Sequence, residues 1–267
     1  MARPARAPDA QPLAGVRAAI TGGGSGIGLA IARRLRALGA LLVLIGRDRA
    51  RLDRAMAELG CDADDEAIAC DVGDAEAVAA AFRSLGARGR APALLVNNAG
   101  TARSVKFADT SPQAWQEALR TNLDGVFHCT RAALASIVDA PFGRIVNVAS
   151  TAGLTGYPYV VAYCAAKHGV VGFTRALALE LARTRVTVNA VCPGYTETAI
   201  VDDAIANIVA TTGRSPAQAR AALASRNPQQ RLVRPDEVAD AVAWLCLPSS
   251  QAITGQAISV SGGEVMR

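Results

Sequence analysis

The 267-residue chain is poor in aromatic side chains, in lysine and in long apolar runs, and each shortage excludes a class of protein. Aromatic residues make up only 4% of the sequence, too few to build the stacking platforms that bind single-stranded nucleic acid. The longest apolar candidate, Leu41 to Gly46, has the length of a strand, whereas a membrane span needs roughly 18 residues. We therefore expect no membrane partner and no nucleic-acid partner.

The positive charge of the chain is dispersed. The formal net charge is +5, yet no run of adjacent basic residues is longer than the pair Arg33-Arg34, and acidic residues are interleaved throughout. All basic residues are arginines except Lys106 and Lys167. A nucleic-acid-binding surface would need its cations clustered on one face or stripe, so the charge pattern supports the exclusion drawn above.

Neither the cysteines nor the histidines are spaced for metal binding. The six cysteines form no CxxC pair, and neither His128 nor His168 has a ligand-like partner nearby in the sequence. We expect reduced thiols in a cytoplasmic protein and no metal site. Residues 1–12 mix Arg, Pro, Ala and Asp without the apolar segment of a secretory signal, and we expect them to form a disordered tail.

Short apolar runs alternate with helical patterns along the chain. Because the runs are continuously apolar, they are typical of strands covered by helices on both faces of a parallel sheet. We expect strands at 16–20, 41–45, 67–70, 93–97, 144–148, 186–191 and 257–260. We expect helices at 27–38, 49–59, 74–85, 112–138 and 162–182, and a last one that begins at 235. This order predicts an α/β fold, a Rossmann-like doubly wound parallel sheet flanked by helices, in one domain over 13–267.

The segment 199–227 breaks the alternation, because its helical pattern is followed by no strand. Apolar residues between Ile200 and Val209 are spaced for one face of a helix, Thr212-Gly213 offers a break, and Ser215-Pro216 can start a second helix. The pair is either a helical lid over a substrate site or a structural element whose apolar face packs on the core or on another subunit.

A glycine-rich turn, Thr21–Gly28, follows the first expected strand and opens the first helix. Its glycines allow a sharp turn and close approach of a ligand, and the helix N-terminus offers unpaired N–H groups to a pyrophosphate. The spacing of Gly22, Gly26 and Gly28 differs from GxGxxG, but the strand–turn–helix context predicts a dinucleotide site.

The end of the second strand indicates which dinucleotide is bound. A carboxylate at this position bonds the ribose 2′-hydroxyl of NAD and repels the 2′-phosphate of NADP. Here Gly46 is followed by Arg47, whose forked donors suit a phosphate. Asp48 comes one residue later, where we expect it to turn outward and cap the next helix. We predict NADP as the cofactor, with NAD as the other possibility.

Ser150, Tyr163 and Lys167 form the most specific pattern in the chain. Tyr163 and Lys167 are four residues apart, so on a helix they share one face. A nearby ammonium is expected to lower the pKa of the phenol from about 10 and make it a usable acid or base. Ser150 follows an expected strand, at the edge of the sheet where such folds bind ligands.

Several segments together resemble the classical short-chain dehydrogenase/reductase family. They are Thr21–Gly28, Cys70–Val72, Asn97–Gly100, Thr121–Phe127, Ser150, Tyr163–Lys167 and Cys192–Thr198. The resemblance covers residues 13–267. The chain departs from the family in 260–263, where Ser261 stands in a position that is often Asp. In the family this region usually packs at a subunit interface, so the departure concerns the interface and leaves the catalytic interpretation unchanged.

The resemblance implies a role for each matching residue. Tyr163 would be the acid/base, Ser150 would bond the carbonyl or hydroxyl oxygen, and Lys167 would bond the nicotinamide ribose and tune Tyr163. Asn122 would anchor a water that relays the proton. The residues assigned to the cofactor by the motifs and the resemblance are Gly22, Ser25, Gly26, Ile27, Gly28, Arg47, Asp71, Val72, Asn98, Ala99, Gly100, Tyr163, Lys167, Pro193, Gly194, Thr196 and Thr198.

Gly169–Thr174 and Asn189–Gly194 are similar to the corresponding segments of ketoacyl-thioester and polyketide ketoreductases. This similarity predicts an NADP-dependent oxidoreductase that interconverts a ketone, such as a 3-oxoacyl thioester, and a secondary alcohol. Two alternatives stay open. One is an NAD(P)-dependent dehydrogenase of a cyclic or aryl secondary alcohol. The other is a non-catalytic dinucleotide-binding sensor, although a sensor has no need of a tuned phenol.

The helices expected at 112–138 and 162–182 carry apolar positions on more than one face. One face must cover the sheet, and the other needs a further partner, which a symmetric copy of the chain supplies. We therefore expect a homo-oligomer, a dimer or a tetramer.

Overall fold

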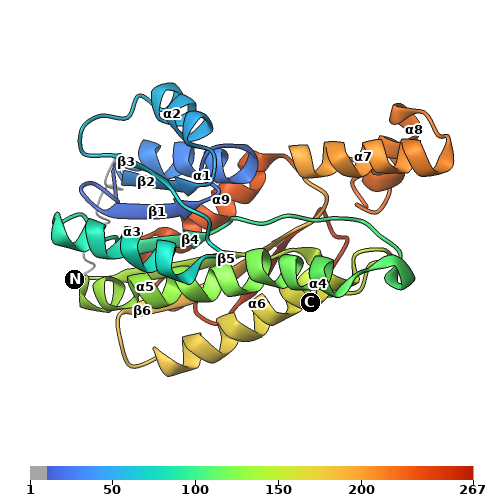
Figure 1. Cartoon of the computed structure of the whole chain (residues 1–267). Helices are drawn as coiled ribbons and strands as arrows, with labels where there is room; N and C mark the ends of the chain where they lie inside the picture. The colour runs from blue at the N-terminus through green and yellow to red at the C-terminus, as the bar shows by residue number, and fades with distance from the viewer. Residues whose placement is uncertain (1–10, 267) are drawn as a thin grey trace.

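The computed structural model describes residues 11–266, so most of the expected tail lies outside the described residues. The described strands form one parallel sheet in the order β3-β2-β1-β4-β5-β6-β7 (Figure 1). They are β1 (Arg17–Thr21), β2 (Leu41–Gly46), β3 (Glu66–Ala69), β4 (Leu94–Asn97), β5 (Gly143–Val148), β6 (Val186–Pro193) and β7 (Ala257–Val260). Each expected strand is present, within one or two residues at its ends.

Helices cover both faces of the sheet, as the continuously apolar strands require. On one face lie α1 (Gly26–Ala37), α2 (Arg49–Glu58) and α9 (Pro235–Cys246). On the other lie α3 (Ala75–Ala87), α4 (Pro112–Leu119), α5 (Gly125–Asp139) and α6 (Val161–Glu180). Each layer buries its own cluster of aliphatic side chains against the sheet. The doubly wound parallel sheet predicted from the sequence is confirmed.

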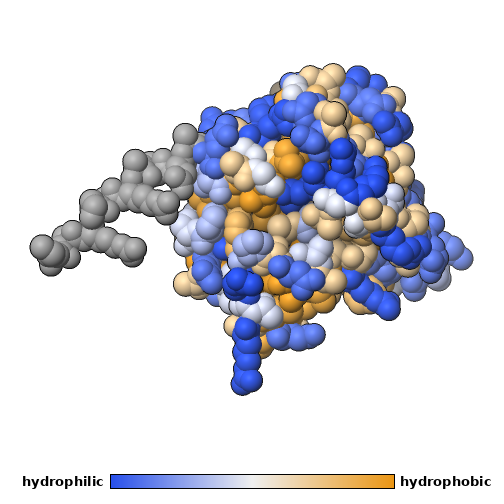
Figure 2. Space-filling model, turned by 90° about the vertical axis from the view of Figure 1, so that its left-hand side faces the viewer, coloured by the Kyte–Doolittle hydropathy of each residue, from blue (hydrophilic) through white to orange (hydrophobic). Residues whose placement is uncertain are grey.

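The strand order reverses between β1 and β4, because β1 leads outward to β2 and β3 while β4 leads the other way to β5, β6 and β7. At such a reversal the two adjacent loops leave in opposite directions and open a crevice at the carboxyl ends of the strands. The glycine-rich turn after β1 and the loop after β4 therefore face each other. The opposite edge, where the strands begin, faces the viewer in Figure 2 and mixes hydrophilic and apolar residues.

The helix expected over 112–138 is present, since residues 112–139 are helical without a break, but its middle departs from α-helical geometry. A π-helical turn, Arg120–Asp124, separates α4 from α5. Asn122 lies inside this turn, and its side-chain amide donates to the carbonyls of Ala118 and Thr101 at 2.9 Å each. These bonds give Asn122 a fixed place at the edge of the crevice. π-turns of this kind occur frequently at functional sites.

The two helices predicted in 199–227 are confirmed as α7 (Ala199–Thr212) and α8 (Pro216–Ala224). Gly213 ends α7 with a φ of +71°, and Ser215 starts α8 with a capping box. The pair projects from the carboxyl edge of the sheet (Figure 1). Part of its apolar face is used internally, since Ile205 and Ile208 pack against the cluster of Val201, Leu223 and Leu232.

No helix within residues 11–266 is long and apolar enough to cross a membrane.

Candidate active site and cofactor cleft

The turn between β1 and α1 requires glycine at two positions, for steric and conformational reasons. Gly22 has a φ of +65°, and a Cβ on Gly28 would lie 2.1 Å from the Gly22 carbonyl oxygen. Any side chain at position 28 would therefore push the turn away from the helix. The turn keeps its shape because the packing leaves no room for a side chain.

The loop after β4 is hydrogen-bonded directly to this turn. The Thr21 hydroxyl oxygen accepts from the backbone N–H groups of Asn98 and Ala99, both at 2.9 Å. The Asn98 side chain donates in return to the Thr21 carbonyl at 2.9 Å. These bonds fix the two loops on either side of the crevice, so that Asn98, Ala99 and Gly100 stand opposite the glycine turn.

The N-terminus of α1 is arranged to receive an anion. Ser25 is the N-cap residue, but its side chain makes no capping hydrogen bond, and the first turn of the helix contains no acidic residue. The first N–H groups of a helix lack internal partners, and the dipole makes this end positive. Together with the glycine turn, this end of α1 fits the pyrophosphate of a dinucleotide.

A cleft of about 470 Å³ runs from this turn across the ends of β2 and β3 to the loop after β4. Seven residues predicted to bind the cofactor line it: Gly22, Ser25, Arg47, Asp71, Val72, Ala99 and Gly100. It is also lined by Gly24, Gly46, Asp48, Arg51, Leu52, Cys70, Thr101 and Thr121, which the sequence analysis did not assign. The size and lining of the cleft fit the adenosine half of a dinucleotide.

Two guanidinium groups stand at the outer end of the cleft. Arg47 follows β2 as predicted. Asp48 caps α2 as expected, its carboxylate accepting from the Arg51 backbone N–H at 3.0 Å, but it lines the cleft and does not turn outward. Arg51 lies in the first turn of α2, and the exposed side chains of Arg47 and Arg51 border the same space. Sequence reasoning missed Arg51, although its place in the first turn of the helix predicted at 49–59, just after Arg47, was an available signal.

Asp71 is held in place at the side of the cleft. Its carboxylate accepts from the Gly73 backbone N–H at 3.0 Å and pairs with the Arg120 guanidinium at 3.0 Å. Partial burial raises the pKa of Asp71, but the Gly73 bond and the Arg120 charge outweigh burial and hold the pKa below its ordinary value. The carboxylate is thus ionised and oriented where the cleft meets the π-turn.

Ser150 lies just after β5, at the carboxyl edge of the sheet. It begins a short 3-10 turn, Thr151–Gly153, and its hydroxyl oxygen accepts from the Ala152 backbone N–H at 3.1 Å. The hydroxyl also lies close enough to the Tyr163 phenol to lower its pKa. Two neighbouring hydroxyl groups suit a carbonyl or alcohol oxygen as a hydrogen-bond partner.

Tyr163 and Lys167 share one face of α6, as their spacing predicted. The Lys167 ammonium lies 5.7 Å from the centre of the Tyr163 ring and donates to the Val148 carbonyl at 2.9 Å. Lys167 is 4% exposed, and burial lowers the pKa of its ammonium to about 8.

The expected direction of the Tyr163 shift was wrong. Burial raises the pKa of Tyr163 to about 12, and the hydrogen bond from Ser150 offsets only part of that effect. The Lys167 ammonium is directed to the Val148 carbonyl rather than to the phenol oxygen, so it does not reverse the effect of burial. At neutral pH the phenol is therefore protonated and able to donate its proton.

Asn122 joins the cofactor cleft to the catalytic side chains. It is fully buried, and its side-chain oxygen accepts from the Thr101 backbone N–H at 3.1 Å. A Cβ on Gly100 would lie 2.8 Å from this oxygen and 3.6 Å from the Lys167 nitrogen. Asn122, Gly100 and Lys167 thus meet where the cleft reaches the Ser150–Tyr163 pair.

The segment 193–198 leaves the carboxyl end of β6 and reaches the glycine turn. The Thr196 hydroxyl donates to the Gly194 carbonyl at 2.9 Å, so it supports the loop and does not face the cleft. Thr198 lies beside the glycine turn: its methyl carbon would be 3.3 Å from a Cβ on Gly26. Pro193, Gly194, Thr196 and Thr198, like Gly26, Ile27, Gly28 and Asn98, lie outside the lining of the cleft itself.

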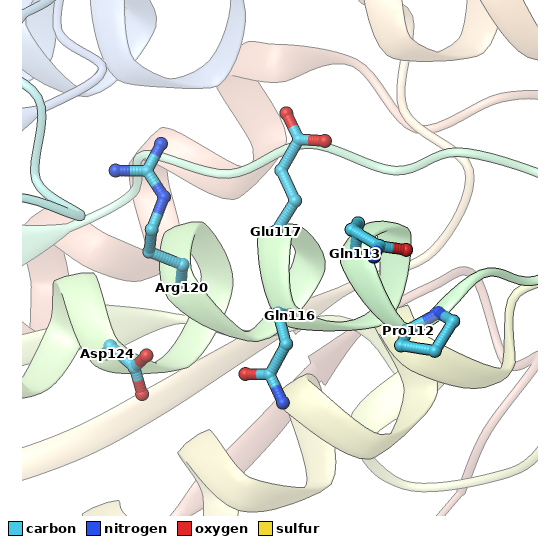
Figure 3. A pocket seen from close by; sticks show the side chains of 6 residues that line it. All are labelled: Pro112, Gln113, Gln116, Glu117, Arg120 and Asp124. Atoms are coloured by element: carbon cyan, nitrogen blue, oxygen red, sulfur yellow. The ribbon is translucent and has the colours of Figure 1, made fainter.

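A second, shallower depression of about 520 Å³ lies along α4 and the π-turn (Figure 3). Its lining is Pro112, Gln113, Gln116, Glu117, Arg120 and Asp124. It contains none of the predicted site residues and reaches the cofactor cleft only through Arg120, which pairs with Asp71. Within residues 11–266, no group of three His, Cys, Asp or Glu side chains is placed to hold a metal ion.

The family model described as Enoyl-(Acyl carrier protein) reductase matches residues 22–264. A putative ketoacyl reductase of the granaticin polyketide synthase from Streptomyces violaceoruber is 41% identical, covering 92% of both chains. A D-beta-hydroxybutyrate dehydrogenase from Cupriavidus necator is 35% identical, covering 95% of this chain and 99% of the relative.

Solved structures agree with these sequence matches. A variant of actinorhodin polyketide ketoreductase, solved with NADPH, superposes with a TM-score of 0.88 at 39% identity, covering 93% of this chain and 97% of that one. Ligand-free aldohexose dehydrogenase from Thermoplasma acidophilum gives a TM-score of 0.85 at 28% identity, with 97% of each chain covered. The fold, the arrangement of the site and these relatives together show that the chain belongs to the short-chain dehydrogenase/reductase family.

Proposed function

We propose that this protein is an NADPH-dependent ketoreductase that converts a ketone, in particular a 3-oxoacyl thioester, to a secondary alcohol, and the reverse with NADP. The observation that carries the proposal is that Ser150, a protonated Tyr163 and Lys167 lie together, with Lys167 next to Gly100 of the cofactor cleft. The ketoacyl reductase relatives and the ketoreductase solved with NADPH support this substrate class and cofactor.

The residues of the cleft fit NADPH in the following way. The glycine turn and the N-terminus of α1 hold the pyrophosphate, and Asp71, Val72 and the 98–100 loop border the adenosine half. Arg47 and Arg51 neutralise the 2′-phosphate. Lys167, Tyr163 and the segment 193–198 would border the nicotinamide end. When bound, the cofactor supplies the hydride.

The chain itself supplies the proton and stabilises the charge on oxygen. Ser150 donates a hydrogen bond to the substrate oxygen, where negative charge develops. Tyr163 transfers its phenolic proton to the same oxygen. A phenol whose pKa is raised to about 12 carries that proton throughout the neutral range. Lys167, beside the Tyr163 ring, would hold the nicotinamide ribose, and Asn122 would anchor the water that relays the replacement proton.

Substitution Tyr163→Phe tests this mechanism. The ring stays and the hydroxyl is lost, so we expect kcat for ketone reduction to fall by roughly 10²–10⁴-fold, while NADPH binds as before. Turnover is measured on a panel of acyl-CoA 3-ketones, cyclic ketones, aryl ketones and an enoyl thioester with both cofactors, and NADPH binding by fluorescence titration.

Near-normal turnover by this variant would contradict the assigned role of Tyr163. Reduction of cyclic or aryl ketones alone by the unaltered protein would favour the dehydrogenase alternative. Cofactor binding without turnover on any substrate of the panel would favour the sensor.

Substitution Arg47→Ala tests the cofactor preference. We expect NADPH binding to weaken by about 1.5–3 kcal/mol, the usual contribution of a hydrogen bond to a charged group, and NADH binding to change little. Isothermal titration with each cofactor measures the two affinities. Arg49→Ala is the matched control, because Arg49 pairs with Asp53 on the same helix and does not line the cleft. Equal losses for both cofactors, or a preference of the unaltered protein for NADH, would refute the assignment.

We further propose that α7 and α8 form a lid over the substrate. They follow the segment 193–198 and add no strand to the sheet, and Ile200, 41% exposed, stands near their attachment to the site. Ile205 and Ile208 pack within the helix pair, so their substitution would disturb folding. Ile200 is therefore the better residue with which to test the lid.

Substitution Ile200→Asp is expected to raise KM for an acyl substrate about tenfold, because burial of an aliphatic side chain contributes roughly 1.5–3 kcal/mol. KM for NADPH and the melting temperature should change little. Steady-state kinetics with each substrate varied in turn measure the difference. An unchanged KM for the ketone would argue that the helix pair is structural.

We also propose that the protein is a cytoplasmic homo-oligomer, a dimer or a tetramer, built on the face of α4, α5 and α6. Phe127 and Leu179 support this, being 46% and 80% exposed on these helices, and all six cysteines are free, which suits a reducing compartment. Light scattering at micromolar concentration should give at least twice the monomer mass. A purely monomeric species would reject this assembly.

A further inference from the structure

Tyr157 joins four segments that are far apart in the sequence. It is 9% exposed, and its hydroxyl lies 2.7 Å from a carboxylate oxygen of Glu264 and 2.9 Å from the hydroxyl of Thr151. Its ring meets that of Tyr195 edge to face, with centroids 6.1 Å apart. The Arg226 guanidinium, just beyond α8, lies 5.2 Å from the centre of the same ring. The loop after Ser150, the segment after β6, the end of the helix pair and the C-terminal segment thus converge on one side chain.

The hydrogen-bonding capacity of these groups fixes the direction of the chain. A carboxylate can only accept, so the Tyr157 hydroxyl donates to Glu264 and its oxygen is left to accept from Thr151. Burial raises the pKa of Tyr157 above its ordinary value, and the bond to Glu264 raises it further, so Tyr157 remains a donor at neutral pH. Glu264 therefore orients Tyr157, which in turn orients Thr151.

Thr151 directly follows Ser150, and the two belong to one short turn. The Ser150 hydroxyl oxygen accepts from the backbone of Ala152 within that turn. On its other side the turn packs tightly on α6, because a Cβ on Gly153 would lie 2.6 Å from the Lys167 carbonyl oxygen. The turn is thus held between α6 and the Tyr157 hydroxyl, and a shift of Thr151 would carry Ser150 with it.

We propose that Glu264 is a positioning residue for the reaction: through Tyr157 and Thr151 it holds the Ser150 hydroxyl in the geometry needed to bond the substrate oxygen. The proposal rests on the function proposed above. It gives the C-terminal segment a part in catalysis, although that segment touches neither the Ser150 nor the Tyr163 hydroxyl among the described contacts.

Kinetics of three variants test the proposal. We expect Tyr157→Phe and Glu264→Leu each to lower kcat for ketone reduction about 10- to 100-fold with KM for NADPH unchanged, because small misplacements of a reacting group are costly. Glu264→Gln keeps an acceptor oxygen for Tyr157 and should retain kcat within a few-fold of the unaltered protein. Tyr159→Phe is the matched control, since Tyr159 is 58% exposed in the same loop, and it should change nothing.

The double variant Tyr157→Phe/Glu264→Leu separates one connected chain from two independent effects. If Glu264 acts through Tyr157, the double variant loses no more activity than the more damaged single variant. Additive losses, a Glu264→Gln variant as damaged as Glu264→Leu, or normal kcat in Tyr157→Phe would overturn the proposal. Should Glu264→Leu fail to fold, Tyr157→Phe carries the test, because it keeps the ring against Tyr195 and Arg226.

Hydrogen exchange tests the same chain without any turnover. We expect the segment 150–157 to exchange faster in Tyr157→Phe than in the unaltered protein or in Tyr159→Phe, all saturated with NADPH and followed by mass spectrometry. Equal exchange in the three proteins would overturn the proposal. Absence of ketone turnover in the unaltered protein would instead refute the proposed function, so the two failures are distinguishable.

Discussion

The hydrogen bonds of Thr21 hold together the two loops on which the site depends. The Thr21 hydroxyl oxygen accepts hydrogen bonds from two backbone N–H groups of the loop after β4, and the Asn98 side chain donates one to the Thr21 carbonyl. The reversal of strand order would otherwise leave these loops free to diverge, since they run toward opposite halves of the sheet. With them joined, the glycine turn, the N-terminus of α1 and Gly100 form one continuous surface for a dinucleotide.

The protonation states of Tyr163 and Lys167 depend on burial more than on the neighbouring charge. Tyr163 and Lys167 are packed closely enough that burial raises the pKa of the phenol and lowers that of the ammonium, each toward its neutral form. A phenol that stays protonated is suited to donate to an alkoxide, the direction of a ketoreductase. Lys167 keeps its place through the Val148 carbonyl, which ties the helix that carries both residues to the end of β5.

Three parts of the chain support Ser150 and the residues around it. The π-turn fixes Asn122 and Thr101 between the cleft and Lys167, and α6 supports the 3-10 turn that Ser150 begins. On the side of this turn away from α6, Tyr157 and Glu264 hold Thr151 in the arrangement proposed above. An active site built on loops at the edge of a sheet needs such lateral support, because the strands fix only where each loop starts.

Local patterns in the sequence predicted most of the architecture. Continuous apolar runs identified the parallel strands, and turn and capping residues located the helix pair, including its break at Gly213 and its restart at Ser215. The spacing of Tyr163 and Lys167 placed both on one face of a helix. Arg47, which follows β2 where NAD-binding proteins carry a carboxylate, lines the cleft as predicted. These features follow from backbone periodicity and nearest neighbours, which are properties of short segments.

Other features were decided only by tertiary structure. The π-turn holds Asn122, whose side chain bonds to Thr101 some twenty residues away, and no helical periodicity in the sequence predicts this turn. Whether the pKa of Tyr163 rises or falls depends on how deeply the phenol is buried. The spacing of residues in the sequence indicates only which charged side chains are near it. Tyr157, Tyr195, Arg226 and Glu264 meet from four separated segments, and each alone has the sequence context of an ordinary loop residue. The sequence by itself thus determined the elements and the reacting groups, and only the folded chain decided their ionisation and support, because both depend on distances between residues remote in sequence.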